Sequence, residues 1–141
     1  MNQQETISLL QQADLRITRS RKLVLDLLAN TGDQAMSSSD IEQQLSGIDR
    51  ITLYRIIKTF EESGLIHSVA DGSGKTKYAM CSHDCGAGDH HDNHVHFHCR
   101  ICDATTCLDT VKLPPVELPA KYTMEEMRFV VAGVCKDCQA V

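Results

Sequence analysis

Hydrophobic residues recur with helical spacing through the N-terminal half of the chain. The clearest pattern lies in residues 49–66, where apolar side chains fall at i, i+3, i+4 and i+7: Leu53, Ile56, Ile57 and Phe60. The opposite face carries polar side chains that can reach bases or phosphates: Thr52, Tyr54, Arg55, Lys58 and Thr59. This pattern predicts an amphipathic helix that ends at Gly64.

Three shorter helices are predicted before it. The first covers residues 5–13, with Ile7 and Leu10 on one side. The second covers residues 18–32 and has Thr18 as its N-cap. Its apolar stripe consists of Leu23, Val24, Leu27 and Leu28. The third begins in the serine run of "SSSDIEQQLSG" and stops near Gly47, with Ile41 and Leu45 facing inward.

After Gly64 the pattern changes from helical to extended. Residues 65–80 form two short runs around Asp71-Gly72-Ser73-Gly74, which is typical of a β-hairpin. Short helices followed by a hairpin are the order of a winged helix-turn-helix, in which the helix before the wing enters the major groove of DNA. A plain helical core with a hairpin is the alternative, and the polar face of residues 52–59 favours DNA binding.

Cysteine and histidine dominate from residue 81 to Cys107, where no helical period remains. "VHFHC" and "ATTCLDTVKL" alternate as strands do, "KLPPVELPAKY" contains prolines that exclude a helix interior, and "RFVVAGVCKDC" predicts a last strand. We therefore predict an α+β protein. A winged-helix domain covers residues 1–81, with a hinge at its end, and a small α/β domain covers residues 82–141.

Composition indicates the cellular compartment of the protein and the role of its cysteines. The chain has 141 residues, of which 42% are hydrophobic but only 4% aromatic, so a metal staple would strengthen its small core. No run approaches the roughly 18 apolar residues of a membrane span, and the N-terminus lacks a signal-peptide pattern. We expect a cytoplasmic protein, in which seven cysteines favour metal binding over disulfides.

The net charge of −5 is not that of a general nucleic-acid binder. Basic residues nevertheless cluster in two places: Arg16, Arg19, Arg21 and Lys22, and then Arg50, Arg55 and Lys58. An acidic protein can bind DNA through a local basic face, although such clusters are often only solvated helix surfaces. The charge pattern alone is therefore weak evidence.

Two CxxC pairs give the strongest chemical signal: Cys99, Cys102, Cys135 and Cys138. Four thiolates from two such pairs can close around one tetrahedral Zn²⁺. Neither pair opens a helix in a βαβ unit, which argues against a thioredoxin-like redox role. There is also no HExxH, and a four-thiolate site leaves no position for water, so a zinc hydrolase is disfavoured.

A histidine pair marks a second candidate site. His94 and His96 lie two apart on the predicted strand and share one face, which His98 continues, whereas Val95 and Phe97 point toward the core. A lone histidine at such a place is more often a surface residue. An H-x-H pair beside cysteines favours metal ligation.

Four segments carry a family resemblance: "ADLRITRSRKLVLDLL", "ITLYRIIKTFEESGLI", "HVHFHCRIC" and "VAGVCKDC". In this order they resemble the signature segments of the ferric uptake regulator (Fur) family, and the match spans nearly the whole chain. The resemblance implies a metal-dependent transcriptional repressor, not an enzyme, with a structural zinc on the four cysteines. It also implies a homodimer, formed by the second domain, that binds palindromic operator DNA when a regulatory hinge metal is present. The resemblance implies neither a membrane nor a small organic substrate as a partner.

The resemblance assigns roles to individual residues. Positions equivalent to the family's DNA contacts are Arg16, Tyr54 and Arg55, and Arg19 matches a recurring basic position of the family. Thr52, which shares the polar face of the same helix, completes the predicted DNA-binding set. Positions equivalent to its hinge ligands are His67, Cys81, His94, His96 and Cys107. The longer hinge segment offers alternative ligands in His83, Cys85, His90 and His91.

The hinge positions depart from the iron-sensing pattern. Iron- and peroxide-sensing members use carboxylates at the hinge and a histidine before the third helix, where this chain has Cys81, Cys107 and "DQAMSSSD". A thiolate and imidazole set suits Zn²⁺ and is a poor site for Fe²⁺ or Mn²⁺. We therefore expect a zinc-responsive regulator, similar to the zinc-uptake regulator (Zur) branch, with two zinc ions per chain. The alternatives are an iron- or peroxide-responsive regulator, or a cytosolic zinc buffer or metallochaperone.

Overall fold

Four helices and a β-hairpin form the N-terminal part of the protein, as predicted. The computed structural model describes residues 2–32, 34–80, 95–108, 111, 114–125 and 127–139. The helices are α1 (Gln3–Gln12), α2 (Arg19–Asn30), α3 (Ser38–Gln44) and α4 (Arg50–Ser63). The hairpin that forms the wing consists of β2 (Ile66–Ala70) and β3 (Thr76–Met80). These elements confirm the winged-helix order.

Short polar side chains cap the helices. The Thr18 hydroxyl accepts a hydrogen bond from the Arg21 backbone N–H at 3.2 Å, which confirms the predicted N-cap of α2. Asp49 starts α4 by accepting from the Thr52 N–H at 2.7 Å. Gly64 ends α4 with a φ of 83°, a left-handed conformation that favours glycine. Local chemistry therefore fixes where α4, the predicted recognition helix, begins and ends.

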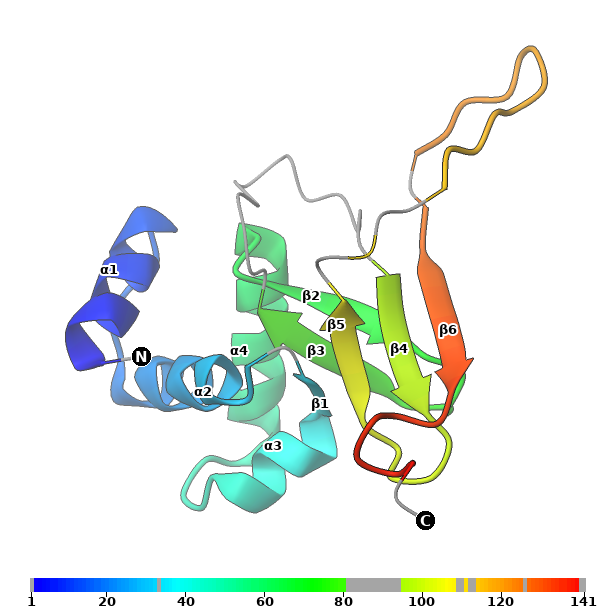
Figure 1. Ribbon diagram of the computed structural model, residues 1–141. Coiled ribbons are helices and arrows are strands. Elements are labelled where there is room, and N and C mark those ends of the chain that lie inside the picture. The colour runs from blue at the N-terminus through cyan, green and yellow to red at the C-terminus, as the bar shows by residue number, and fades with distance from the viewer. Residues whose placement is uncertain are drawn as a thin grey trace.

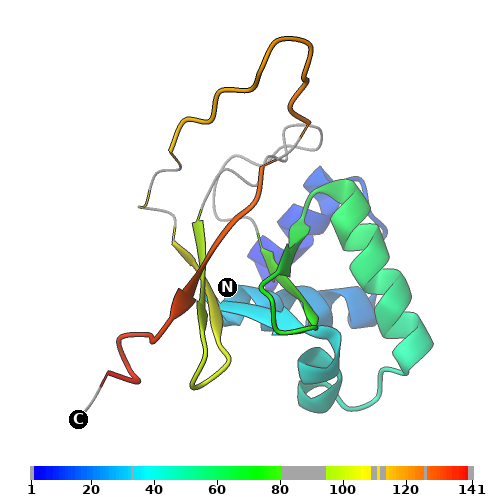
Figure 2. The same ribbon diagram turned by 90° about the vertical axis from the view of Figure 1, so that its right-hand side faces the viewer.

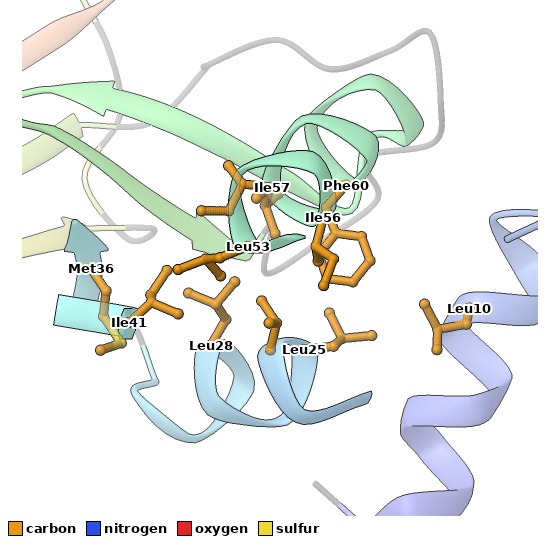
Figure 3. Packing of buried hydrophobic residues seen from close by; sticks show 11 residues of the cluster. Leu10, Leu25, Leu28, Met36, Ile41, Leu53, Ile56, Ile57 and Phe60 are labelled. Atoms are coloured by element: carbon orange, nitrogen blue, oxygen red, sulfur yellow. The ribbon is translucent and has the colours of Figure 1, made fainter. Parts of the chain in front are cut away.

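The apolar face of α4 packs against α2, α3 and α1 (Figure 3). Leu53, Ile56, Ile57 and Phe60 are all buried, as their spacing predicted. The stripe predicted for α2 was partly wrong. Its buried residues are Val24, Leu25 and Leu28, whereas Leu23 and Leu27 are only half-buried. The helix is rotated relative to the predicted stripe because it packs between α1 and α4.

A strand that the sequence did not reveal joins the two parts of the molecule. β1 (Gln34–Ser37) pairs antiparallel with β3 of the wing and also with β5 (Thr105–Leu108). The resulting six-stranded sheet has the order β2-β3-β1-β5-β4-β6, with β4 at Val95–Cys99 and β6 at Phe129–Gly133. The helices gather on one side of the molecule and β4 to β6 on the other (Figures 1 and 2). The domain division at residue 81 stays a prediction.

The C-terminal part is extended, as its prolines predicted. Residues 114–125 contain a turn but no helix, and they project from the side of the sheet where β6 starts (Figure 2). β6 lies at the edge of the sheet and runs parallel to β4. Among the described residues, no helix combines the length and the apolar character needed to cross a membrane.

Candidate metal centres and nucleic-acid interface

The four cysteines of the two CxxC pairs meet at one end of the sheet. The sulfur atoms of Cys99, Cys102, Cys135 and Cys138 all lie within 4.8 Å of one another. Cys102 Sγ and Cys135 Sγ are 3.8 Å apart. Four sulfurs about 2.3 Å from a tetrahedral Zn²⁺ are separated by about 3.8 Å, so the donor set and its spacing both fit zinc.

Two neighbouring strands bring these cysteines together. β4 ends at Cys99, and the next turn is closed by hydrogen bonds of 2.9 Å from Cys99 N to Ala104 O and from Asp103 N to Cys99 O. β6 pairs Gly133 with Cys99, which carries the second CxxC pair to the first. A Cβ at position 133 would lie 3.3 Å from Cζ of Phe97, so a larger residue there would require that ring to shift.

Neighbouring groups lower the pKa of one of these thiols and raise the pKa of another. The backbone N–H groups of Cys102 and Cys135 donate toward the sulfur of Cys99, which lowers the pKa of Cys99 to about 6. The adjacent Cys135 thiol, followed by burial, raises the pKa of Cys138 to about 12. One thiolate therefore forms readily, whereas ionisation of all four sulfurs needs a cation among them.

Two of the predicted hinge ligands also come together, and a third lies on the neighbouring strand. His67 on β2, His96 on β4 and Cys107 on β5 are buried, with exposed fractions of 3%, 4% and 6%. His96 and Cys107 lie directly opposite each other in the antiparallel pair. His67 Nε2 is 3.3 Å from His96 Nε2. Two imidazole nitrogens about 2.0–2.1 Å from one tetrahedral ion are about 3.3 Å apart, although a hydrogen bond between the rings has a similar length.

The structure does not place the other candidate ligands beside His67 and His96. Cys81 and His94 lie outside the described residues, as do the alternatives His83, Cys85, His90 and His91. His98 does not join His67 and His96. Its Nε2 lies 2.7 Å from Asp103 Oδ1 instead.

The predicted orientation of β4 needs a correction. Val95 is buried as expected, but Phe97 is only half-buried and His96 is buried almost completely. The face that carries His96 is covered because the wing strand β2 lies over it. The alternation of a single strand cannot reveal such a cover.

All five residues predicted to contact DNA are exposed: Arg16, Arg19, Thr52, Tyr54 and Arg55. The three on α4 lie on the face opposite the core. Tyr54 is 61% exposed, and Lys58 Nζ stands 6.0 Å from the centroid of its ring. The backbone carbonyl of Arg16 accepts a hydrogen bond of 2.8 Å from Arg21 Nη1, which holds the segment before α2 against that helix.

Sequence reasoning missed one residue of this face. Ile51, in the first turn of α4, is 64% exposed although it is apolar. Its position beside Thr52 and one turn before Arg55 would suit contact with a thymine methyl group. The signal was present in the sequence, because Ile51 does not share the face of Leu53 and Ile57.

Comparison with known proteins identifies the family. The sequence profile of the "Ferric uptake regulator family" matches residues 12–139. The chain belongs to this family. Its members are metal-responsive, dimeric, DNA-binding transcription regulators and not enzymes.

Relatives within the family include proteins named for different signals. The "Ferric uptake regulation protein" of Neisseria meningitidis serogroup B is 26% identical over 148 residues, which cover 99% of this chain and 97% of that protein. The "Peroxide-responsive repressor PerR" of Staphylococcus aureus strain Mu50 is 26% identical over 144 residues, covering 96% and 90%.

Solved structures share the fold. A zinc uptake regulator complexed with zinc and DNA aligns with a TM-score of 0.67 at 19% identity, covering 97% of this chain and 92% of that one. The ferric uptake regulator of Vibrio cholerae aligns with a TM-score of 0.61 at 18% identity, covering 91% and 98%.

Proposed function

We propose that this Fur-family protein is a zinc-responsive transcriptional repressor that binds palindromic operator DNA as a homodimer. The observation that carries the zinc assignment is the donor set at the hinge. His67 and His96 bring two imidazole nitrogens within 3.3 Å of each other in a buried position, Cys107 lies opposite His96 in the strand pair, and nitrogen with sulfur donors suits Zn²⁺ better than Fe²⁺ or Mn²⁺. As a DNA-bound regulator with reduced thiols, the protein is expected to act in the cytoplasm.

Two metal sites with different roles are part of the proposal. The cluster of Cys99, Cys102, Cys135 and Cys138 would hold a structural zinc, because four thiolates bind tightly and leave no open position. The hinge residues would hold a regulatory zinc, with Cys81 and His94 completing the predicted ligand set. We also retain residues 1–81 as the DNA-binding domain and 82–141 as the dimerisation domain.

Switching would follow from the origin of the hinge ligands. His67 belongs to the wing, whereas His96 and Cys107 belong to β4 and β5. These residues could coordinate one zinc ion together only when the wing lies against the second half of the protein. Metal and DNA would then favour the same arrangement, and each tenfold gain in DNA affinity requires about 1.4 kcal/mol of coupling.

The exposed face of α4 would enter the major groove. Arg55 and Tyr54 stand outward there with Thr52, and Arg16 and Arg19 flank the helix as phosphate contacts. A dimer would place two such helices in successive major grooves of a palindrome.

The partner surface would include the edge of the sheet. Val130 and Val131, which point to opposite faces of the edge strand β6, are 37% and 39% exposed. Further exposed apolar side chains occur in the neighbouring extended segment: Val116, Leu118, Tyr122 and Met124. An apolar edge strand of this kind suits pairing with a second copy of the chain.

A DNA-binding titration in zinc buffers tests the proposal. The duplex is one that the wild-type protein selects from a randomised pool. The wild-type protein should bind it when free zinc is high and release it when zinc is chelated. His96→Ala should lose this zinc dependence while the zinc of the four-cysteine site stays bound. Arg55→Ala, as the control, should lose DNA binding and keep both zinc ions. Unchanged zinc-dependent affinity in His96→Ala would falsify the hinge switch.

Iron or peroxide sensing is the second candidate, because relatives at 26% identity carry those names. The same titration with Fe²⁺ and Mn²⁺ under anaerobic conditions separates it from zinc sensing. DNA binding activated by Fe²⁺ at concentrations below those needed for Zn²⁺ would favour this candidate. Absence of DNA binding at every metal concentration would favour a zinc buffer.

A further inference from the structure

A buried charged cluster lies between the wing and the turn that carries Cys99 and Cys102. Its central residues are Asp71 and Lys77 of the wing and Thr105 at the start of β5, with exposed fractions of 5%, 3% and 0%. A β-hairpin can form without a buried ion pair, so hairpin formation does not explain why Asp71 and Lys77 are buried. Burying an ammonium and a carboxylate is costly unless they are paired and hydrogen-bonded, so the arrangement calls for a role.

The contacts of this cluster satisfy both charges. Lys77 Nζ lies 2.9 Å from Asp71 Oδ2, and the two side chains are 4% and 0% exposed. Lys77 Nζ also donates to Thr105 Oγ1 at 3.1 Å, and the Thr105 hydroxyl donates to the Asp71 carboxylate. The Ser73 N–H donates to Asp71 Oδ1 at 2.9 Å. Burial alone would raise the pKa of Asp71, but the bonds from Ser73, Thr105 and Lys77 hold it well below its usual range.

The cluster continues into the CxxC turn. Lys77 Nζ donates to the backbone carbonyl of Asp103, the residue after Cys102, and lies 3.8 Å from its carboxylate. His98 Nε2, from the residue before Cys99, lies 2.7 Å from Asp103 Oδ1 and 3.9 Å from Asp71 Oδ2. Asp103 has a φ of 64°, so the carbonyl that Lys77 reaches depends on the shape of this turn.

We propose that Asp71, Lys77 and Thr105 are positioning residues for DNA binding, because they fasten the wing to the Cys99–Cys102 turn. The fastening fixes how the winged domain is oriented relative to the rest of the dimer. A metal at the four-cysteine cluster, which shapes that turn, then acts on the wing as well as on its own domain. The effect on DNA rests on the proposed function, whereas the fastening itself can be measured without DNA.

Hydrogen exchange on the full-length, zinc-loaded protein tests the fastening. Lys77→Met removes the ammonium and keeps most of the side-chain volume. Lys75→Met is the matched control, because Lys75 is an exposed lysine of the same strand region. Lys77→Met should raise amide exchange in the wing and in residues 100–108 more than in α2 and α4, where any rise reflects only the loss of global stability. Thr105→Val, which removes only the bridging hydroxyl, should give a smaller change in the same segments and serves if Lys77→Met folds poorly.

DNA binding then tests the positioning role. The probes are a palindromic duplex selected by the wild-type protein and a duplex with a single half-site. Lys77→Met should weaken binding to the palindrome about tenfold or more and leave half-site binding unchanged, since only the palindrome requires a fixed orientation of both winged domains. Lys75→Met should leave the preference for the palindrome over the half-site unchanged.

Three results would overturn the proposal. Wing exchange in Lys77→Met equal to that in Lys75→Met would mean that the wing is not fastened by this cluster. A rise in exchange that includes α2 and α4 equally would mean that the cluster serves only global stability. Equal loss on the palindrome and the half-site would mean that orientation is not its role. Absence of DNA binding by the wild-type protein would instead contradict the proposed function, and the exchange comparison would still decide the fastening.

Discussion

Replacement of Lys77 by methionine is the sharpest test of how the buried cluster contributes to stability. The substitution removes the ammonium that lies 2.9 Å from Asp71 Oδ2 and leaves a buried carboxylate without its charged partner. Methionine retains most of the aliphatic stem, so little packing volume is lost. The measured change therefore reports mainly on the charge.

The structure sets the size of the expected effect. Removing one partner of a buried ion pair costs about 3–5 kcal/mol, because the remaining charge stays buried. Asp71 keeps the hydrogen bonds from the Ser73 N–H and the Thr105 hydroxyl, which favours the lower end, about 3 kcal/mol. In Asp71→Asn/Lys77→Met both charges are absent, so the double variant should be more stable than Lys77→Met alone.

Urea unfolding at neutral pH, followed by circular dichroism at a fixed zinc concentration with a reductant, measures these free energies. Lys75→Met should differ from the wild-type protein by no more than about 0.5 kcal/mol, because an exposed side chain has no buried partner. The reasoning would be refuted if Lys77→Met unfolded within about 1 kcal/mol of the wild-type protein. It would also be refuted if the double variant were less stable than the single one.

Of three further predictions, two concern the metal centre and one concerns the dimer. Cys138→Ser should lower the zinc content to at most one ion per chain and unfold the C-terminal strands. Metal analysis and circular dichroism measure these two effects. A stable variant with unchanged zinc content would exclude a structural site. Zinc binding to metal-free protein should release more protons at pH 5 than at pH 7, because the pKa of Cys99 is about 6 and its thiol is mostly protonated only below that value. Zinc affinity therefore falls as pH falls, and calorimetry in buffers of different ionisation enthalpy measures the release. Val131→Asp, on the edge strand, should shift the protein toward monomers in analytical ultracentrifugation, and an unchanged dimer would place the interface elsewhere.

The helices of the N-terminal part were predictable because their signals are local. Thr18 and Gly64 mark helix ends through hydrogen bonds and backbone conformations that involve only neighbouring residues. The apolar face of α4 follows from the helical period alone. The stripe of α2 was less predictable, since Leu23, Val24, Leu25, Leu27 and Leu28 offer two overlapping faces and only packing selects one.

The strand β1 had no comparable local signal. Four residues between two helices show no clear alternation, and their strand conformation comes from partners far away in sequence, on β3 and β5. The cover over His96 was hidden for the same reason, because it comes from the wing. Propensity and periodicity describe a segment by itself and cannot report its distant neighbours.

The sequence by itself determined the order of the four helices and the wing, the membership in the Fur family and the residue types available for metal binding. Cysteine spacing was sufficient to group Cys99 with Cys102 and Cys135 with Cys138, since each pair is local. Only the tertiary structure decided that the two pairs meet, through the parallel pairing of β4 and β6. It alone decided that His67 faces His96, and that Lys77 of the wing is buried beside Asp103 and Thr105. These contacts depend on strand pairing between distant segments, where burial of paired groups and not local preference selects the arrangement.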